Sequence, residues 1–240
     1  MSMKMRAQNI LNRLGYELSR VDKVGVDPFA DMRLLLPSAR LIFDVGANVG
    51  QCAKRFRQTF PLAEIYSFEP CPRTFAKLQR ATAYDQGIQS WNCALGAEPG
   101  RQLLHDYGDQ SDLNSLLPAS SGFWAKPAAE TEVEVRTIDC LRAEKQLPAI
   151  DVLKSDTQGY DLNVLRGAMR SLQEDVRLVY LEVNFAQLYE GQGSFGEEFD
   201  LLTSVGFRLF SLYKVFRVDG LAGWTDAVFM HRSLLPLNAV

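Results

Sequence analysis

The sequence predicts an α/β domain in which helices cover both faces of an open, mostly parallel sheet. Residues 41–50 read as a buried strand that runs into a glycine turn and then into a helix. Further along the chain, short apolar strands alternate with helical segments, and several of these strands end next to an acidic residue. The 240 residues are 47% hydrophobic and show no break in composition, so one large domain with a sizeable core is expected.

Charge and cysteine content exclude several classes of protein. The formal net charge is −3, which provides no basic field for tracking phosphates, so no nucleic acid is expected as a partner. The four cysteines lie far apart and away from any pair of histidines, which indicates neither a zinc site nor a disulfide framework. No apolar run reaches the length of a membrane span, and the N-terminus lacks the apolar region of a signal peptide. A cytoplasmic location is therefore expected.

Residues 1–37 are expected to form a helical extension ahead of the main domain, residues 38–240. Apolar side chains fall on one face of its first helix: Met3, Ala7, Ile10, Leu11 and Leu14. Basic residues lie elsewhere on this helix, so it could bind an anionic membrane surface peripherally or meet a second subunit in a homodimer. Packing on its own domain is the commoner outcome. A second helix is expected within residues 27–37, with Asp27 as its N-cap.

Residues 41–50 have the outline of a nucleotide-binding turn. Gly46 and Gly50 permit positive φ angles and a close approach of a ligand to the backbone, and they bracket Asn48. The first N–H groups of the following helix have no partner within the helix and face the ligand. Asp44, just before the turn, can accept from a ligand cation or from N–H groups of the turn. From these residues alone, a strand-to-helix turn that binds nothing is the alternative.

The second and third strands supply further candidate cofactor contacts. The strand over residues 64–68 leads to Glu69, about twenty residues beyond the glycine turn, where an acidic side chain accepts from both hydroxyls of a ribose. The alternative for Glu69 is a surface carboxylate that caps the next helix. The third strand, residues 88–93, brings Asn92 and Ala94 to a place where they could meet the edge of a purine.

A long polar connection follows, between Gly96 and Thr137, in which only short pieces have the character of strands. So long a connection in a compact domain is more often a binding loop or lid than an idle segment. Asp112 and Ser115 could reach a substrate from it. His105 precedes the expected lid and is a candidate base, with an ordinary polar residue as the alternative.

The C-terminal half returns to a dense pattern of strands and helices. The strand over residues 151–156 ends at Asp156, and the next strand carries Glu182 near its end. Open α/β sheets bind ligands outside the carboxyl ends of their strands, so both carboxylates are candidate substrate contacts. The last two strands, residues 207–215 and 226–231, are expected to form an antiparallel hairpin joined by a longer loop. Helices are expected over residues 51–60, 72–82, 162–169 and 198–205.

Two classes of cofactor combine a glycine turn with an acidic residue on the second strand: flavin or nicotinamide dinucleotides, and S-adenosylmethionine. Dinucleotide sites want the pattern GxGxxG, whose second glycine lets the backbone approach a pyrophosphate. Asn48 stands at that position, and its side chain would crowd a pyrophosphate. It is acceptable beside the smaller, cationic amino-acid sulfonium, for which Asp44 supplies the opposite charge. The residues therefore favour S-adenosylmethionine.

A series of motifs occurs in one order between residues 41 and 232: Asp44-Val45-Gly46-Ala47-Asn48-Val49-Gly50, Ser67-Phe68-Glu69-Pro70, Asn92-Cys93-Ala94-Leu95-Gly96, Thr137-Ile138-Asp139, Leu153-Lys154-Ser155-Asp156-Thr157-Gln158-Gly159-Tyr160-Asp161, Leu165-Arg166-Gly167-Ala168 and Leu181-Glu182-Val183. Together they resemble the FkbM-type S-adenosylmethionine-dependent methyltransferases. Ser155, Thr157 and Asp161 depart from the family pattern. These departures affect what is expected of the substrate side of the site near Asp156, not the fold or the cofactor.

The resemblance implies a Rossmann-like class I methyltransferase fold, with a mostly parallel seven-stranded sheet, an antiparallel last strand and helices on both faces. It also implies O-methylation of a hydroxyl group on a sugar or glycan, or on a polyketide or other secondary metabolite. Residues 12–18 resemble the starts of methyltransferases and glycosyltransferases found with glycan assembly, which favours a sugar.

A sugar hydroxyl is a poor nucleophile until its proton is removed or shared, and the sequence offers few bases for that task. Asp156 is the first candidate, because the fourth strand ends next to the transferred methyl group in this fold. Glu182 could share the task, orient a substrate hydroxyl or complete a metal site with Asp156. His105 is the third candidate. The two histidines cannot by themselves form a transition-metal cluster, and no resident metal is expected.

Two other functions fit the same pattern less well. A binding protein could keep the nucleotide fold without turnover, but such a scaffold has no need of carboxylates at the ends of the second, fourth and fifth strands. An NAD-dependent oxidoreductase is the third possibility, and the residue at position 48 argues against it.

Overall fold

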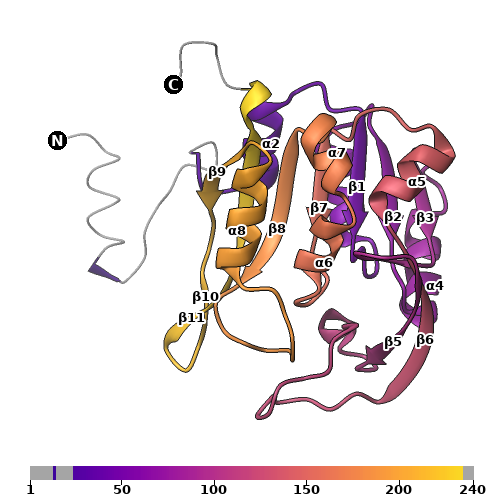
Figure 1. The fold of residues 1–240 in the computed structure, drawn as a ribbon, viewed down its shortest axis with the longest axis vertical. Coiled ribbons are helices and arrows are strands. Elements are labelled where there is room, and N and C mark those ends of the chain that lie inside the picture. Colours follow the sequence, from indigo (N-terminus) through magenta and orange to yellow (C-terminus); the bar gives the residue numbers. More distant parts are fainter. Residues whose placement is uncertain (1–12, 15–23, 235–240) are drawn as a thin grey trace.

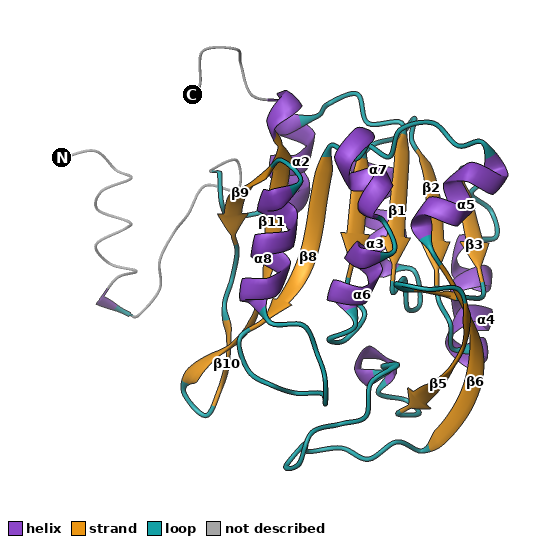
Figure 2. Cartoon of the chain, viewed as in Figure 1, coloured by secondary structure: helices purple, strands orange, loops and turns teal. Residues whose placement is uncertain are grey.

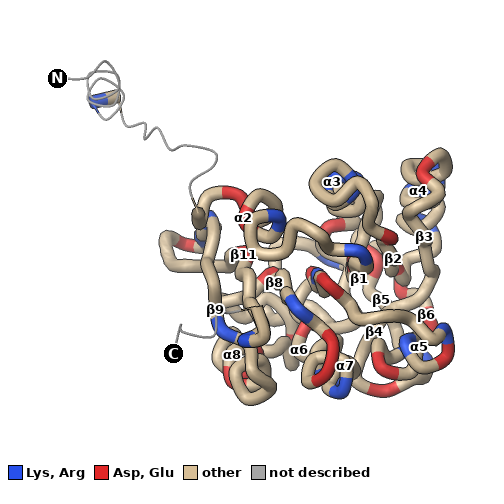
Figure 3. The backbone as a smooth tube through the Cα atoms, turned by 90° about the horizontal axis from the view of Figure 1, so that it is seen from above, with Lys and Arg blue, Asp and Glu red and all other residues tan. Residues whose placement is uncertain are grey.

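The structure is a computed structural model that describes residues 13–14 and 24–234 (Figure 1). The apolar helix expected within residues 3–14 lies almost wholly outside the described residues, so the membrane or subunit contact inferred from it stays a prediction. Within the described part, charges of both signs are interspersed along the backbone (Figure 3). No helix of that part is long and apolar enough to span a bilayer.

The first helix after the gap, α2 (Pro28–Leu35), begins as its sequence predicts. Asp27 is the N-cap, and its Oδ1 accepts from the backbone N of Phe29 at 2.9 Å. Phe29 and Met32 are buried in the core, so α2 packs against the rest of the fold. The domain boundary expected after residue 37 stays a prediction.

The main sheet of the described chain has eight strands, in the order β10-β11-β8-β7-β1-β2-β3, with β9 also paired to β11. Its parallel strands are β1 (Leu41–Val45), β2 (Glu64–Phe68), β3 (Ile88–Trp91), β7 (Val152–Ser155) and β8 (Leu178–Asn184). The antiparallel strands are β9 (Phe207–Leu212), β10 (Phe216–Val218) and β11 (Leu221–His231). The expected α/β architecture, with a mostly parallel sheet and an antiparallel last strand, is confirmed.

The C-terminal hairpin differs from the expectation in one respect. The connection expected to be a loop contains β10, which pairs antiparallel with the first part of a long β11. The main sheet therefore has one strand more than the expected seven. Asp219 and Gly220 both take positive φ angles in the turn between β10 and β11, which a two-residue hairpin turn requires.

Helices cover both faces of the main sheet (Figures 2 and 3). Beside α2, one face carries α3 (Gln51–Thr59) and α4 (Pro72–Thr82). The other face carries α5 (Ile138–Lys145), α6 (Asp161–Arg166), α7 (Met169–Glu174) and α8 (Phe195–Ser204). A short 3-10 helix, η2 (Arg232–Leu234), follows β11.

Alternation along the central strands divides the core into two halves. Phe43 of β1 and Leu153 of β7 are fully buried on the side of α5 to α8, whereas Ile42 and Val152 are fully buried on the side of α2 and α3. Both faces of β1 are buried, as in other parallel strands covered by helices. This packing fixes the register of the strands and so the positions of the residues at their carboxyl ends.

The connection expected to be a lid contains a second, three-stranded sheet. It consists of β4 (Ala94–Leu95), β5 (Gly100–Asp106) and β6 (Ala129–Arg136), in the order β4-β6-β5. Residues 107–128, here called the lid, join β5 to β6 and include the 3-10 helix η1 (Ser111–Leu113). The lid lies beyond the carboxyl ends of the parallel strands of the main sheet (Figure 1).

Glu198 on α8 provides a test of stability against pH. Its side chain is 2% exposed, and burial, with the nearby Asp161, raises its pKa to about 9. Since the pKa is higher in the fold than in the unfolded chain, the group is neutral in the fold, and stability falls as the pH rises from about 4.5 towards 9. We expect Glu198→Met to raise the free energy of unfolding by about 3 kcal/mol at pH 8. At about pH 4.5 the increase should be much smaller.

Urea unfolding of the variant and of the original protein at both pH values measures this difference. Glu197→Gln is the matched control, because Glu197 lies on the same turn but is exposed and caps the helix through Ser194. An equal effect of Glu198→Met at both pH values would contradict the expectation.

Candidate functional site

A pocket of about 770 Å³, including its open mouth, lies at the carboxyl ends of β1, β2 and β7. Its floor is formed by the glycine turn and by the residues that follow β2 and β7, and its roof by residues 111–116 of the lid. Of the predicted cofactor contacts, the lining contains Gly46, Asn48, Glu69 and Ala94.

Glycine is required at Gly46 by its surroundings. Its φ angle is +70°, and a Cβ added there would lie 1.8 Å from the backbone oxygen of Asp156. Gly50, at φ +92°, is the N-cap of α3 and packs against Leu78 of α4. Both positions favour glycine in this conformation. The turn is therefore held tightly between the ends of β1 and β7.

Asn48 also has a left-handed backbone, with φ +48°. Asparagine tolerates this region better than most residues. Its backbone N donates to Oε2 of Glu69 at 3.0 Å, and its side-chain Oδ1 accepts from the hydroxyl of Ser111 at 2.9 Å. Asn48 thus joins the glycine turn to the end of β2 on one side and to the lid on the other.

Glu69 lines the pocket but is only 5% exposed. Besides Asn48, its carboxylate accepts from the backbone N of Cys71 at 2.9 Å. Burial raises the pKa of Glu69 to about 7, and these two hydrogen bonds oppose that rise. Asn92 is exposed and lies outside the lining, where its amide donates to the backbone oxygens of Glu69 and Pro70. Asn92 thereby holds the end of β2.

Asp44 lies beneath the pocket and does not line it. Its carboxylate is fully buried, 3.1 Å from the ammonium of Lys154, which also donates to the backbone oxygens of Val45 at 3.1 Å and Gly46 at 2.9 Å. Burial raises the pKa of Asp44, against the attraction of Lys154. Burial also lowers the pKa of Lys154, but the carboxylates of Asp44 and Asp156 outweigh it and leave that pKa raised. The ammonium of Lys154 therefore balances the negative charge of Asp44 within the protein.

The two candidate bases on neighbouring strands are linked to each other. Asp156 lines the pocket with its side chain 37% exposed, 3.8 Å from the ammonium of Lys154. Glu182 of β8 lies outside the lining, and Gln158 donates from one amide nitrogen to Oδ1 of Asp156 at 3.0 Å and to Oε1 of Glu182 at 3.1 Å. Burial and then the charge of Asp156 raise the pKa of Glu182 well above its usual value.

His105, the third candidate base, is not brought to the pocket. It lies on β5 with its Nδ1 3.1 Å from Oε1 of Glu130, and it is absent from the lining. Asp112 and Ser115 of the lid do line the pocket. Among the described residues, no three histidine, cysteine, aspartate or glutamate side chains are placed to hold a metal ion.

Two important residues of the site were missed by the sequence reasoning. Lys154 is a charged residue in a short buried strand that begins with Val152 and Leu153, and that mismatch alone was a signal of a buried partner. Gln158 gave no such signal, because its role depends on two carboxylates from different strands.

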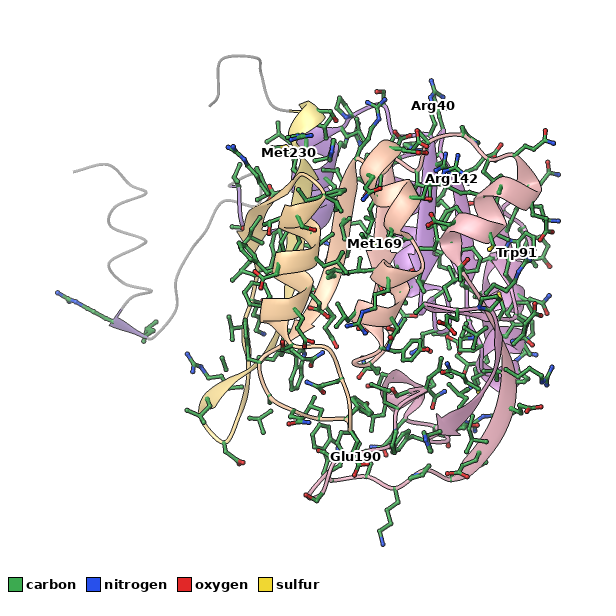
Figure 4. The ribbon with its side chains drawn as sticks, in the orientation of Figure 1. Arg40, Trp91, Arg142, Met169, Glu190 and Met230 are labelled. Carbon is green, nitrogen blue, oxygen red and sulfur yellow. The ribbon has the colours of Figure 1, made fainter. Side chains whose placement is uncertain are left out.

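The lid is fastened to the site at several points. The hydroxyl of Ser115 donates to the backbone oxygen of Gln158 at 2.7 Å, and Tyr189 OH lies 3.1 Å from the backbone oxygen of Leu113. The backbone N of Glu190, labelled in Figure 4, donates to the oxygen of Pro118 at 2.8 Å. The roof of the pocket is thus held by the turn after β7 and by the loop after β8.

Comparison with known proteins gives one family match and several relatives. The family model described as the methyltransferase FkbM domain matches residues 44–209. The 2-O-methyltransferase NoeI of Sinorhizobium fredii is 30% identical over 174 residues, which cover 68% of this chain and 71% of the relative. The 31-O-demethyl-FK506 methyltransferase FkbM of Streptomyces tacrolimicus is 28% identical over 196 residues, with 70% and 73% covered.

A third relative is the hexuronic acid methyltransferase AglP of Haloferax volcanii, 27% identical over 166 residues that cover 64% of this chain and 61% of the relative. Among solved structures, the methyltransferase FkbM from Methylobacillus flagellatus KT superposes with a TM-score of 0.53 and 17% identity. That match covers 81% of this chain but only 44% of the solved chain, and it supports the fold.

Proposed function

Because the chain belongs to the FkbM methyltransferase family, we propose that it methylates a hydroxyl group of a sugar or of a secondary metabolite. It is a methyltransferase with a Rossmann-like fold, and its cofactor is S-adenosylmethionine. The observation that carries the proposed chemistry is the position of Asp156. Its partly exposed carboxylate lies in the wall of the pocket, directly after β7 and beside the glycine turn.

The residues of the pocket fit S-adenosylmethionine. Glu69 would accept from ribose hydroxyls, because its buried carboxylate lines the pocket and each oxygen has one further lone pair beyond its backbone hydrogen bond. Gly46 would let the cofactor approach the backbone, and the small Ala94 would lie against the base. When bound, S-adenosylmethionine supplies an electrophilic methyl group on a positively charged sulfur.

Asp44 was expected to supply negative charge opposite the sulfonium of the cofactor, but from its buried position it would act on the cofactor only indirectly. The ammonium of Lys154 balances the charge of Asp44. Asp156 is the carboxylate next to this pair that also lines the pocket. We propose that Asp156 contributes the negative charge on the methyl side of the pocket, while Asp44 and Lys154 hold the turn in place.

The chain's own part in the reaction is to position the acceptor, to remove its proton and to exclude water. Asp156 would accept the proton of the attacking hydroxyl as the bond between its oxygen and the methyl carbon forms and the bond from that carbon to sulfur breaks, with S-adenosylhomocysteine as the leaving group. Glu182 would support it through Gln158. Residues 111–116 of the lid cover the pocket and would keep water from the reacting atoms. His105 is a poor candidate for the base, since it lies outside the lining.

A sugar is the acceptor class we favour. The name of AglP specifies a hexuronic acid, and the name of FkbM specifies a derivative of FK506. Polar side chains of the lid, Asp112, Asn114 and Ser115, face the same pocket as Asp156, and such groups suit an acceptor with several hydroxyls.

The proposal is tested by incubating the purified protein with isotope-labelled S-adenosylmethionine and a panel of glycosides and uronic acids. We expect label in an alkali-stable methyl ether and a thermal shift with S-adenosylmethionine but not with NAD. Binding of the cofactor without transfer to any hydroxyl compound would favour a binding protein without turnover. Stabilisation by NAD alone would favour the oxidoreductase.

Glu69→Ala is expected to weaken binding of S-adenosylmethionine by about 100-fold, because two hydrogen bonds to ribose at a charged acceptor are lost. Isothermal calorimetry measures this loss. Asn92→Ala is the matched control, because Asn92 holds the same backbone turn from outside the pocket. Unchanged affinity of Glu69→Ala would remove Glu69 from the ribose site.

Location and assembly complete the proposal. A cytoplasmic location is supported by the cysteines, all four of which are free, because free thiols are typical of a reducing compartment. A homodimer and a peripheral membrane contact through the N-terminal helix remain proposals from the sequence alone. Size-exclusion chromatography with light scattering, and sedimentation with anionic vesicles, would test the two separately.

A further inference from the structure

Gln158 uses every polar atom of its side-chain amide. Its Nε2 donates to Asp156 at 3.0 Å and to Glu182 at 3.1 Å, and its Oε1 lies 3.3 Å from the hydroxyl of Tyr189. The network itself fixes which amide atom is nitrogen, because the opposite orientation would place an oxygen against two carboxyl groups. An amide has two N–H groups, one for each carboxyl group.

The backbone of Gln158 is fixed as well. It has a left-handed φ of +55°, and its carbonyl oxygen accepts from Ser115 of the lid at 2.7 Å. The next residue, Gly159, accepts from the backbone N of Gly193 at 3.3 Å. A side chain that is held by two carboxyl groups, a tyrosine and the lid has little freedom to turn away from the pocket.

Negative charge dominates the surroundings of this amide. The carboxyl groups of Asp161 at the start of α6 and Asp226 on β11 raise the pKa of Glu182, in addition to burial and Asp156, and only Lys154 opposes them. Other titratable groups near the pocket are Asp44 on β1, Glu69 after β2, Asp112 of the lid, Tyr160 and the thiol of Cys52 on α3. Arg55 of α3 and Tyr180 of β8 act on Asp226. Two adjacent carboxylates here cannot both ionise without a large cost.

We propose that Gln158 is a positioning residue that ties Asp156 and Glu182 into one unit with a single proton, which leaves Asp156 ionised and facing the pocket. This inference rests on the proposed role of Asp156 as proton acceptor. The proton resides on Glu182, whose neutral form is favoured by burial and by the charge of Asp156, whereas Asp156 has the ammonium of Lys154 at 3.8 Å. The amide favours the ionised form of Asp156 by donating to it.

Glutamine suits this position better than glutamate or an apolar residue would. Glutamate has no N–H to donate, and it would insert a third carboxylate between the first two. Methionine has a similar length but would leave both carboxyl oxygens without that donor. In either variant the ionised form of Asp156 loses a hydrogen-bond donor.

The test is the pH profile of kcat for Gln158→Glu and Gln158→Met. We expect the acid limb to move to higher pH by about one unit in each variant, with kcat recovering to within a few-fold of the original at high pH. A merely structural role would lower kcat by the same factor at every pH. An acid limb that stays in place in both variants would overturn the proposal.

Gln192→Met is the matched control. Gln192 is a glutamine of the loop after β8 whose amide bonds only to the backbone of residues 186, 188 and 189, and touches no carboxyl group. We expect this variant to lower the melting temperature without moving the acid limb. A shift as large as that of the Gln158 variants would show that loop damage alone moves the profile, and would overturn the proposal.

A second measurement needs neither cofactor nor acceptor. Glu198 is also neutral in the fold and gives a band of its own, so the infrared spectrum of Glu182→Gln is subtracted from that of the original protein. The difference should contain the band of one further protonated carboxyl group at neutral pH, and absence of this difference band would overturn the shared proton. If the band is present but no acceptor is ever methylated, the proposed function fails while the paired unit stands.

Discussion

Replacement of Lys154 by methionine is expected to lower the free energy of unfolding by about 3–5 kcal/mol. The change leaves the carboxylate of Asp44 fully buried without a countercharge, and it removes the donor for the backbone oxygens of Val45 and Gly46. Removal of one partner of a buried ion pair costs far more than the net contribution of the pair, because the remaining charge stays desolvated. Chemical denaturation at pH 7 measures the loss.

The double variant Asp44→Asn with Lys154→Met separates the buried charge from the packing. We expect it to recover a large part of the stability lost by Lys154→Met, since no buried charge remains unpaired. Arg55→Met is a control for loss of a cation at an exposed ion pair, with Asp27, and its effect should stay within about 1 kcal/mol. Equal stability of the single and the double variant would contradict this account of the pair.

Asp156→Asn is expected to lower kcat by about 100- to 10,000-fold, the usual contribution of a general base, while S-adenosylmethionine still binds. Asparagine keeps the shape of the side chain and can still accept from Gln158, so the pocket should retain its form. Initial rates with labelled cofactor and calorimetry on the same preparation measure the two quantities.

Glu190→Gln is the matched control for this second prediction, because Glu190 is an exposed carboxylate in the loop that meets the lid. Its removal should leave kcat within a few-fold of the original. Methylation by Asp156→Asn at the original rate would rule out Asp156 as the base and would direct attention to Asp112, the carboxylate that the lid contributes to the lining.

Local signals in the sequence were sufficient for much of the fold. The bounds of β2 and α4 agree with the expectation, since a proline opens the helix at Pro72 and the strand before it is rich in β-branched and aromatic residues. The helix expected over residues 162–169 is divided instead into α6 and α7. Gly167 lies in the break, where a Cβ would meet the backbone oxygen of Gly96, a residue far away in the sequence.

Other elements had weak or ambiguous local signals. The helix α5 was missed, although Thr137 caps it by accepting from the backbone N of Cys140, because the preceding residues read as a continuing strand. The strand β10 is only three residues long and exposes Phe216, so it lacks the buried face that periodicity detects.

The site was predictable where one short segment determines it and less so where distant segments meet. Gly46 and Glu69 each lie in a motif and both line the pocket. Asp44 also lies in a motif, but its environment is decided by Lys154, which reaches it from another strand. His105 pairs with Glu130 across the second sheet, and that pairing draws it away from the pocket.

The hydroxyls of Ser111 and Ser115 connect the lid to both turns that border the pocket, at Asn48 and at Gln158. Opening of the roof therefore requires both connections to separate, together with the hydrogen bonds that tie Leu113 and Pro118 to the loop after β8. Two neutral hydrogen bonds contribute about 1 kcal/mol each, so the two serines together favour the shut roof by about thirtyfold. Part of the residence time of the cofactor is therefore set by two serine side chains.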